Sequence, residues 1–189
     1  MLENEYLENR VNRIIEENNL RKHPEGGYYI QIYKSPNKIA VSSRYKGDRT
    51  RPEFTKINYF LIGNDFSAWH KVASDEIWRF KEDSSLTLHI IDHNANLAQV
   101  KIGNPNEEID AVSEFLVGHS QWFAASVNDK HLFSFVECEV RPGFMFDDFE
   151  LGIKEGLIKT YPNHRAIIEK YSVVDKIEIP NQSHSILSA

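Results

Sequence analysis

The chain opens with a helical pattern of apolar residues and then changes to the pattern typical of strands. Residues 5–19 carry an apolar stripe at three- and four-residue spacing, formed by Leu7, Val11, Ile14 and Ile15. This spacing predicts an amphipathic helix, whose continuation is blocked at His23-Pro24. A second short helix is expected over residues 164–171, directly after Pro162-Asn163.

Between these helices, short runs rich in aromatic and β-branched residues alternate with turn-forming clusters of Gly, Asn, Asp and Pro. The runs that predict strands are 28–33, 56–62, 76–80, 86–91, 98–102, 114–117, 121–127 and 132–140. Many short strands with few intervening helices predict one all-β sandwich or barrel. We expect a helical appendage at 1–22, a single β domain at 23–180 and a flexible tail at 181–189.

Composition and charge exclude several classes of partner. The chain has 22 basic and 28 acidic residues and a net charge of -6, so it lacks the basic footprint of a nucleic-acid-binding protein. It has neither the apolar run of a signal peptide nor a stretch near the ~20 apolar residues of a membrane span. The single cysteine, Cys138, cannot form an intrachain disulfide. We therefore expect a cytoplasmic protein without nucleic-acid or membrane partners.

Residues 67–80 carry the most informative polar side chains. Strand alternation places Glu76, Trp78 and Phe80 on one face. A carboxylate that shares a face with aromatic rings is costly to bury without a partner, and His70 is the nearest candidate in sequence. Such a pair can bind a metal, move a proton or hydrogen-bond a ligand. The structural alternative is a satisfied pair at a turn.

Other residues are candidates for ligand contact, each beside a structural alternative. Glu25 lies in a Pro-Glu-Gly-Gly stretch, so it either faces a ligand or belongs to a turn that requires glycine conformations. Arg44 either reaches an anionic ligand group or is a surface residue. Tyr59 and Trp122 each have a polar atom that suits a pocket wall, with core packing as the alternative.

The spacing of His70 and Glu76 resembles the first cupin motif, Gly-x5-His-x-His-x3-4-Glu-x6-Gly. In that motif two His and the Glu usually bind a metal. Val72 stands at the second His position, and in the second cupin motif Phe123 stands at the metal-binding His position. The chain thus keeps two of the usual four ligands.

The resemblance to one branch, the cupin-5 family of largely uncharacterised proteins, is closer. It rests on five separated motifs in the same order, at 23–29, 58–62, 69–78, 122–125 and 141–150. It covers nearly the whole chain after residue 20, and Val72 is typical of that family. The resemblance implies a double-stranded β-helix, or jelly-roll, barrel with short terminal helices, which pairs as a homodimer.

The resemblance also implies a first hypothesis for function, a metal-independent isomerase or epimerase without a cofactor. The family looks similar to sugar-nucleotide 3,5-epimerases, which use a His base on the same barrel. In this hypothesis His70 takes a proton next to a carbonyl of a sugar-like substrate, Glu76 orients His70, and Tyr59 is the acid.

Two alternatives stay open. A non-catalytic cupin that binds a small molecule would offer aromatic stacking faces from Trp69, Trp78 and Trp122. A metal-dependent enzyme would use His70 and Glu76 as ligands of a divalent cation, with a third ligand such as His89 or Glu137. We rank the isomerase or epimerase first, the binding module second and the metal enzyme third.

Overall fold

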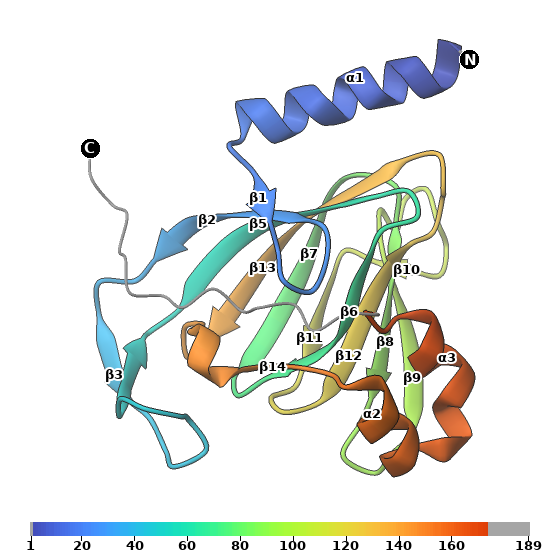
Figure 1. Ribbon diagram of the computed structural model, residues 1–189. Coiled ribbons are helices and arrows are strands. Elements are labelled where there is room, and N and C mark those ends of the chain that lie inside the picture. The colour runs from blue at the N-terminus through green and yellow to red at the C-terminus, as the bar shows by residue number, and fades with distance from the viewer. Residues whose placement is uncertain (1, 174–189) are drawn as a thin grey trace.

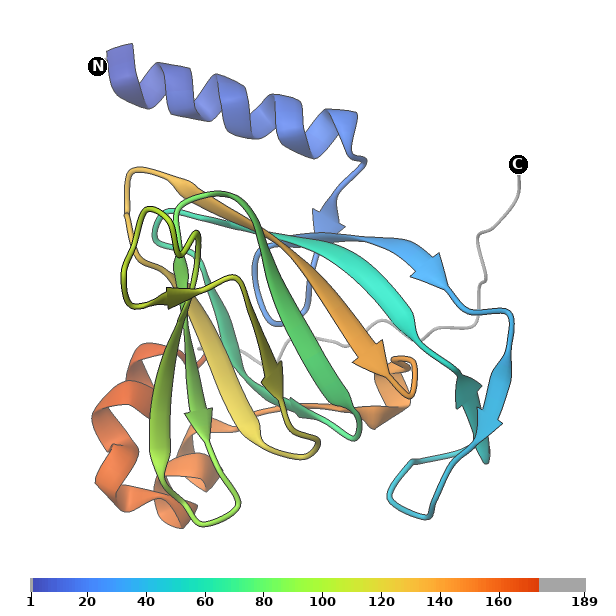
Figure 2. The same ribbon diagram turned by 180° about the vertical axis from the view of Figure 1, so that it is seen from behind.

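The structure, a computed structural model, describes residues 2–173, and its strands form two six-stranded sheets that close into a barrel (Figures 1 and 2). The first sheet has the order β1 (Arg21–Lys22), β2 (Tyr28–Lys34), β5 (Thr55–Ile62), β13 (Phe133–Arg141), β7 (Asp75–Asp83) and β11 (Glu114–Val117). The second has the order β10 (Ala111–Val112), β9 (Leu97–Ile102), β8 (Leu86–Ile91), β12 (Trp122–Val127), β6 (Phe66–Val72) and β14 (Phe149–Leu151). A hairpin of β3 (Lys38–Ala40) and β4 (Thr50–Pro52) extends beyond the barrel (Figure 1).

The main core lies between the two sheets. It is built from every second residue of the strands, because side chains alternate between the faces of a sheet. Its buried members are Tyr59, Leu61, Trp78, Leu86, Leu88, Ile90, Ile102, Val117, Phe123, Ala125, Val127, Val136 and Cys138. The prediction of an all-β jelly-roll barrel with short helices at both ends is confirmed.

Helices cover part of each outer face. The helix α1 (Leu2–Glu17) lies over the first sheet, where Val11 packs with Phe60 and Phe133 (Figure 1). The helices α2 (Lys154–Thr160) and α3 (Arg165–Lys170) cover the second sheet. Two 3-10 turns, η1 (Phe146–Asp148) and η2 (Pro162–His164), connect the C-terminal elements. None of the helices within residues 2–173 has the length and apolar character needed to cross a membrane.

All eight predicted strands are present near their expected bounds. Six strands were not predicted: five of them are two or three residues long, and the sixth is β6. Its burial alternates poorly because most of its residues are buried, so the local sequence gives no period-two signal. The short strand β1 lies within the expected appendage 1–22 and joins it to the sheet through β2. The predicted tail at 181–189 and the end of the predicted domain 23–180 lie outside the described residues.

A buried ion pair fastens the β3–β4 hairpin to the segment that contains η1. The Nε atom of Arg51 lies 2.6 Å from Oδ2 of Asp148, and its Nη2 donates to Oδ1 at 2.9 Å. The guanidinium also donates to the backbone oxygens of Lys46, Asp48 and Thr50. Both partners are satisfied, which is the condition for a buried charge pair to persist. The pair holds in place a segment that forms one wall of the cavity described next.

Candidate functional site

A cavity of about 310 Å³ lies inside the barrel, against the first sheet and the strands β6 and β14. Its polar wall contains His23, Glu25, His70 and Glu76. Its apolar wall includes the aromatic rings of residues 144–149: Phe144, Phe146 and Phe149. The cavity therefore combines titratable groups with ring faces, as sites for small polar molecules do.

The carboxylate of Glu25 lies between two imidazoles. Its Oε2 atom lies 3.3 Å from Nε2 of His70 and 3.4 Å from Nδ1 of His23. Its Oε1 atom accepts a hydrogen bond from the hydroxyl of Ser67 at 2.9 Å. Since Glu25, His70 and Ser67 are all buried, these contacts hold the three side chains in one arrangement.

The hydrogen bonds of His70 fix which ring nitrogen can exchange a proton. The Nδ1 atom lies 2.8 Å from the backbone oxygen of Ala68. A carbonyl oxygen only accepts, so Nδ1 carries the hydrogen and Nε2 is left for proton exchange. In His23 the situation is reversed, because its Nδ1 accepts from the backbone N–H of Glu25. Burial lowers the pKa of His23, which favours its neutral form.

The turn before β2 explains how Glu25 reaches the cavity. Gly26 and Gly27 have φ angles of 115° and 64°, a region that side-chain-bearing residues rarely adopt. A Cβ atom on Gly26 would lie 2.2 Å from the backbone oxygen of Phe66. The backbone N–H of Ala68 also donates to the oxygen of Glu25 at 2.8 Å, which joins the turn to β6. The motif is thus a turn that requires glycine and, at the same time, a support for Glu25.

Glu76 also lines the cavity, and the pKa of its carboxyl is strongly shifted. Burial, together with the nearby charge of Glu25, raises the pKa of Glu76 from its usual value near 4.5 to about 8. The group therefore holds a proton at neutral pH. The carboxylate within ion-pair distance of His70 is that of Glu25, which corrects the expectation that Glu76 orients the imidazole.

Tyr59 lies outside this cavity lining, which corrects its expected role as the acid. Its hydroxyl donates to the backbone oxygen of Gly26 at 2.7 Å, and the residue is 1% exposed. Burial raises the pKa of Tyr59 well above its usual value. The hydroxyl therefore supports the turn that carries Glu25, and it is Glu76 that offers an acidic proton to the cavity.

The predicted stacking residues also lie elsewhere. Trp69 and Trp122 point to the outer face of the second sheet and pack beneath α2 and α3, because their neighbours His70 and Phe123 point inward. Trp78 lies within the main core, 5.6 Å from the ring of Tyr59.

Arg44 lies over the ring of its neighbour Tyr45, 5.2 Å from the ring centroid, and does not line the cavity. Of the predicted ligand-binding residues, Glu25 alone lines it.

Several cavity residues were missed by the sequence analysis. His23 belongs to the same motif as Glu25, so the motif held a signal for it. The rings of Phe144, Phe146 and Phe149 lie in a segment that contains the 3-10 turn η1, which has no hydrophobic period. Only the fold brings this segment against β6.

Comparison with known proteins assigns the chain to a family. No curated protein matches it. The model of the cupin-5 family, Cupin superfamily (DUF985), matches residues 12–152. The chain belongs to the cupin-5 family.

Solved structures agree with this assignment. This cupin is similar to a crystal structure of a Shewanella oneidensis protein, with 32% identity, 87% of this chain and 98% of the other covered, and a TM-score of 0.76. A hypothetical protein from Leishmania major shares 28% identity, with coverages of 84% and 96% and a TM-score of 0.75. Oxalate decarboxylase from B. subtilis shares 12% identity over 84% of this chain and 38% of its own, with a TM-score of 0.51. That last likeness shows the fold alone.

The residues of this cupin do not fit the metal centre of metal-binding cupins. The Val72 side chain lines the cavity where a second His would stand, and the ring of Phe123 lies 4.0 Å from that of His70. Neither side chain has a donor atom. Within residues 2–173, no three or more His, Cys, Asp or Glu side chains are grouped so that they could hold a metal ion.

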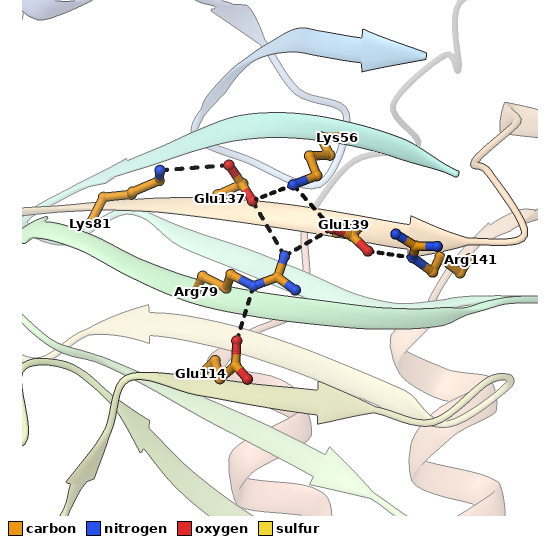
Figure 3. Close-up of polar contacts among 7 residues, drawn as sticks. All are labelled: Lys56, Arg79, Lys81, Glu114, Glu137, Glu139 and Arg141. Atoms are coloured by element: carbon orange, nitrogen blue, oxygen red, sulfur yellow. Dashed lines mark hydrogen bonds and ion pairs between the residues drawn. The ribbon is translucent and has the colours of Figure 1, made fainter. Parts of the chain in front are cut away.

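The two residues considered as a third ligand point away from the cavity. His89 lies on the outer face of the second sheet, stacked on Tyr171 at 4.6 Å and bonded to Ser126 at 3.1 Å. It is 4% exposed, because the segment after α3 covers it. Glu137 lies on the outer face of the first sheet among paired charges (Figure 3).

Those paired charges form a network across β5, β13, β7 and β11 (Figure 3). Arg79 lies 3.0 Å from Glu139 and 3.0 Å from Glu114, while Lys56 lies 3.1 Å from Glu139. Although burial opposes it, hydrogen bonds from Arg141, Lys56 and Arg79 lower the pKa of Glu139 to about 2. Each cation of the network has a carboxylate partner. These ion pairs explain the position of Glu137, so a role as a metal ligand is not needed to explain it.

Proposed function

We propose that this cupin is a metal-independent isomerase or epimerase that enolises a small polar carbonyl compound, such as a sugar. The observation that carries the proposal is the presence of a base and an acid in one cavity. The base is His70, backed by Glu25 at 3.3 Å, and the acid is Glu76. A cavity of about 310 Å³ suits a small molecule, at the lower end of the usual range of ~300–1,000 Å³.

His70 acts as the base through Nε2. Its other nitrogen is held by the Ala68 oxygen, so the ring cannot turn freely when it accepts a proton. The Glu25 carboxylate lies at this same nitrogen and stabilises the positive charge that the ring gains, whereas in a Ser-His-Asp triad the carboxylate bonds the other ring nitrogen. Ser67 in turn holds Glu25. A base positioned in this way contributes a factor of about 10² to 10⁴ to the rate of proton transfer.

Glu76 acts as the acid. With a pKa of about 8 it carries a proton at neutral pH, whereas a carboxyl with its usual pKa near 4.5 does not. With Glu76 as the acid, the role of base is left to His70 in the same cavity.

The proposed step is balanced by these groups alone. Nε2 of His70 takes the hydrogen of the carbon next to the carbonyl, and the electron pair of that C–H bond forms a C=C bond. The carbonyl oxygen takes the proton of Glu76, which gives an enol. When the enol turns over in the cavity, His70 returns its proton to the opposite face of the same carbon and the enol hydroxyl gives its proton back to Glu76, which yields the epimer. When the carbon that lost its hydrogen carries a hydroxyl, His70 returns its proton to the former carbonyl carbon and that hydroxyl gives its proton to Glu76, which yields the isomer.

Hydrogen exchange in D₂O tests the proposal across a range of candidate substrates. The protein is incubated with a panel of neutral, phosphorylated and carboxylated aldoses and ketoses, and ¹H NMR follows the loss of C–H signals. We expect one compound or a small set to lose the signal next to the carbonyl. The variant His70→Asn is expected to slow this exchange by at least about 10²-fold.

The control is His131→Asn, which alters an exposed histidine outside the cavity and is expected to exchange at the wild-type rate. If His70→Asn exchanged hydrogen at the wild-type rate, His70 would not be the base. Binding of a compound without any exchange would instead favour the binding module. The rings of Phe146 and Phe149 in the cavity wall support that second candidate, because sugar rings stack on aromatic faces.

We further propose that the protein forms a homodimer. Support comes from β2, which pairs with β1 through Tyr28 and Tyr29 alone and leaves Ile32 and Tyr33 45% and 43% exposed. An open strand edge with apolar residues favours pairing with another chain. Light scattering coupled to size-exclusion chromatography measures the mass directly, and a monomer at micromolar concentration would contradict the proposal. The cytoplasmic location stays a prediction.

A further inference from the structure

Two cationic side chains, Arg21 and Lys34, line the same cavity as His70 and Glu76. Both residues are exposed, whereas His70 and Glu76 are buried, so the cations lie at the mouth and the titratable pair at the floor. Neither Arg21 nor Lys34 forms an ion pair with a carboxylate in the part of the chain that the structure describes.

The cations on the outer face of the same sheet are different. Arg79, Lys56, Lys81 and Arg141 all lie within ion-pair distance of Glu137 or Glu139 (Figure 3). The first sheet thus carries cations with carboxylate partners on its outer face. Its cations at the cavity, Arg21 and Lys34, have no carboxylate partner within residues 2–173. Unpaired cations in a concave site attract anions.

A bulge in β2 directs Lys34 into the cavity. In register with β5, Gln31 lies opposite Ile57, but the next partner, Lys56, lies opposite Tyr33, so one residue is extra. Regular alternation from Gln31 would turn Tyr33 inward. Instead Tyr33 stacks on Phe54 at 4.9 Å, and Lys34 lines the cavity. Bulges near binding sites re-aim side chains in this way.

Arg21 reaches the mouth from the neighbouring strand. It lies in register with Tyr29, which also lines the cavity, while Lys34 lies in register with Thr55. The charge of Glu25 repels an anion from the floor of the cavity. A molecule with one anionic end is therefore oriented with that end at the mouth and its uncharged part at the floor.

We propose that Arg21 and Lys34 bind an anionic group of the substrate, a phosphate or a carboxylate, while its uncharged part reaches His70 and Glu76. The inference rests on the proposed function and names the substrate class of the same site, a small polar carbonyl compound with one anionic group. The planar guanidinium pairs with two oxygens of such a group, and the ammonium adds a point charge.

Calorimetric titration with glucose 6-phosphate, glucuronate and glucose tests this inference at low and high salt. We expect glucose 6-phosphate, glucuronate or both to bind the wild-type protein at least about tenfold more tightly than glucose. Tighter binding of the first identifies a phosphate site, and tighter binding of the second a carboxylate site. Added NaCl is expected to weaken the binding of the two anions and to leave the binding of glucose unchanged.

The double variant Arg21→Gln, Lys34→Gln is expected to weaken anion binding about tenfold or more. The matched control Lys38→Gln, Arg49→Gln removes the same charge from exposed residues outside the cavity and is expected to bind as wild type. Circular dichroism confirms that both variants are folded. An equal loss in the control, or glucose binding as tightly as both anions, overturns the inference.

Binding is read without turnover, so the two proposals fail separately. Unchanged anion affinity in the Arg21 and Lys34 variant overturns the anion site and leaves the roles of His70 and Glu76 intact. Anion binding that persists in His70→Asn, with exchange lost, supports both proposals.

Discussion

The Nε2 atom of His70 lies 3.3 Å from the Oε2 atom of Glu25, although the two residues belong to separate segments of the chain. Glu25 belongs to the turn before β2 and His70 to β6, and the Ala68 N–H bond to the Glu25 oxygen joins those segments at 2.8 Å. Glu25 is the partner of His70, while Glu76 holds its own proton because burial and the charge of Glu25 raise its pKa to about 8. The cavity thus gains a base and an acid from three residues.

Proton exchange by the wild-type protein is expected to fall as the pH rises through about 8. Burial and the charge of Glu25 raise the pKa of Glu76 to about 8, so above this pH the acid is ionised. Glu76→Gln is expected to slow exchange by about 10²-fold at neutral pH and to remove this inflection. A pH–rate profile checks both, and a wild-type rate that stays constant through pH 8 would contradict the assignment.

The same shift predicts a change of stability with pH. Folded protein keeps Glu76 protonated up to about 8, whereas the unfolded chain releases that proton near 4.5. The contribution to the free energy of unfolding is therefore full below about 4.5 and is lost as the pH rises through about 8, by up to a few kcal/mol. Urea denaturation at several pH values should show that the free energy of unfolding falls less with rising pH for Glu76→Gln than for wild type. An equal dependence on pH in the two proteins would refute the pKa shift of Glu76.

Substitution of Gly26 should damage both the fold and the site. In Gly26→Ala the new Cβ would lie 2.2 Å from the Phe66 oxygen at a φ of 115°, so the turn must shift. We expect the free energy of unfolding to fall by about 1–3 kcal/mol and proton exchange to slow, because Glu25 is adjacent. Urea denaturation and D₂O exchange measure the two effects.

Gly156→Ala is the matched control for Gly26→Ala. Its Cβ would meet nothing within 4 Å, and it lies in the helix α2. Because alanine favours helix over glycine, the variant is expected to be more stable by about 0.5–1 kcal/mol. Similar losses in both variants would show that the Gly26 turn has no special requirement.

Breaking the buried ion pair between Arg51 and Asp148 should cost far more than breaking an exposed one. Arg51→Met leaves the Asp148 carboxylate buried without its partner, and we expect a loss of about 3–5 kcal/mol in the free energy of unfolding. Arg165→Met breaks a pair with Glu169 whose side chains are 62% and 49% exposed, so a loss below about 1 kcal/mol is expected. Equal losses in chemical denaturation would argue against the buried pair.

His89 should make the protein sensitive to acid. Burial, with a smaller effect of the Lys170 charge, lowers the pKa of His89 from 6.5 to about 4. The unfolded chain therefore takes up this proton first as the pH falls, and stability present above about 6.5 is lost on the way to pH 4, by about 3 kcal/mol.

The test of the His89 prediction is denaturation between pH 4 and pH 7. His89→Gln is expected to lose less stability over this range than wild type, while His131→Gln, at an exposed position, should follow wild type. The buried His23 contributes equally to all three proteins, since burial lowers its pKa as well. An unchanged slope for His89→Gln would show that another group causes the acid sensitivity.

Local pattern was sufficient for most of the fold. The eight predicted strands exist because alternation within a strand and turn residues at its ends are properties of a few neighbouring positions. The same local rule placed Glu76 on one face with Trp78 and Phe80, and in the structure Glu76 lines the cavity while the two rings pack in the core. Motif spacing likewise singled out His70 and Glu76, which line the same cavity.

The sequence by itself therefore determined the barrel and singled out three residues of its cavity, Glu25, His70 and Glu76, because those features depend on short-range order. Only the tertiary structure decided that Glu25 pairs with His70, that Trp69 faces outward and that Lys34 faces inward. Each of these depends on the order and register of strands that are distant in sequence. Most residues of β6 are buried on both faces, so its sequence shows no alternation of apolar and polar residues. One extra residue in β2 reverses the face of every residue after it in that strand.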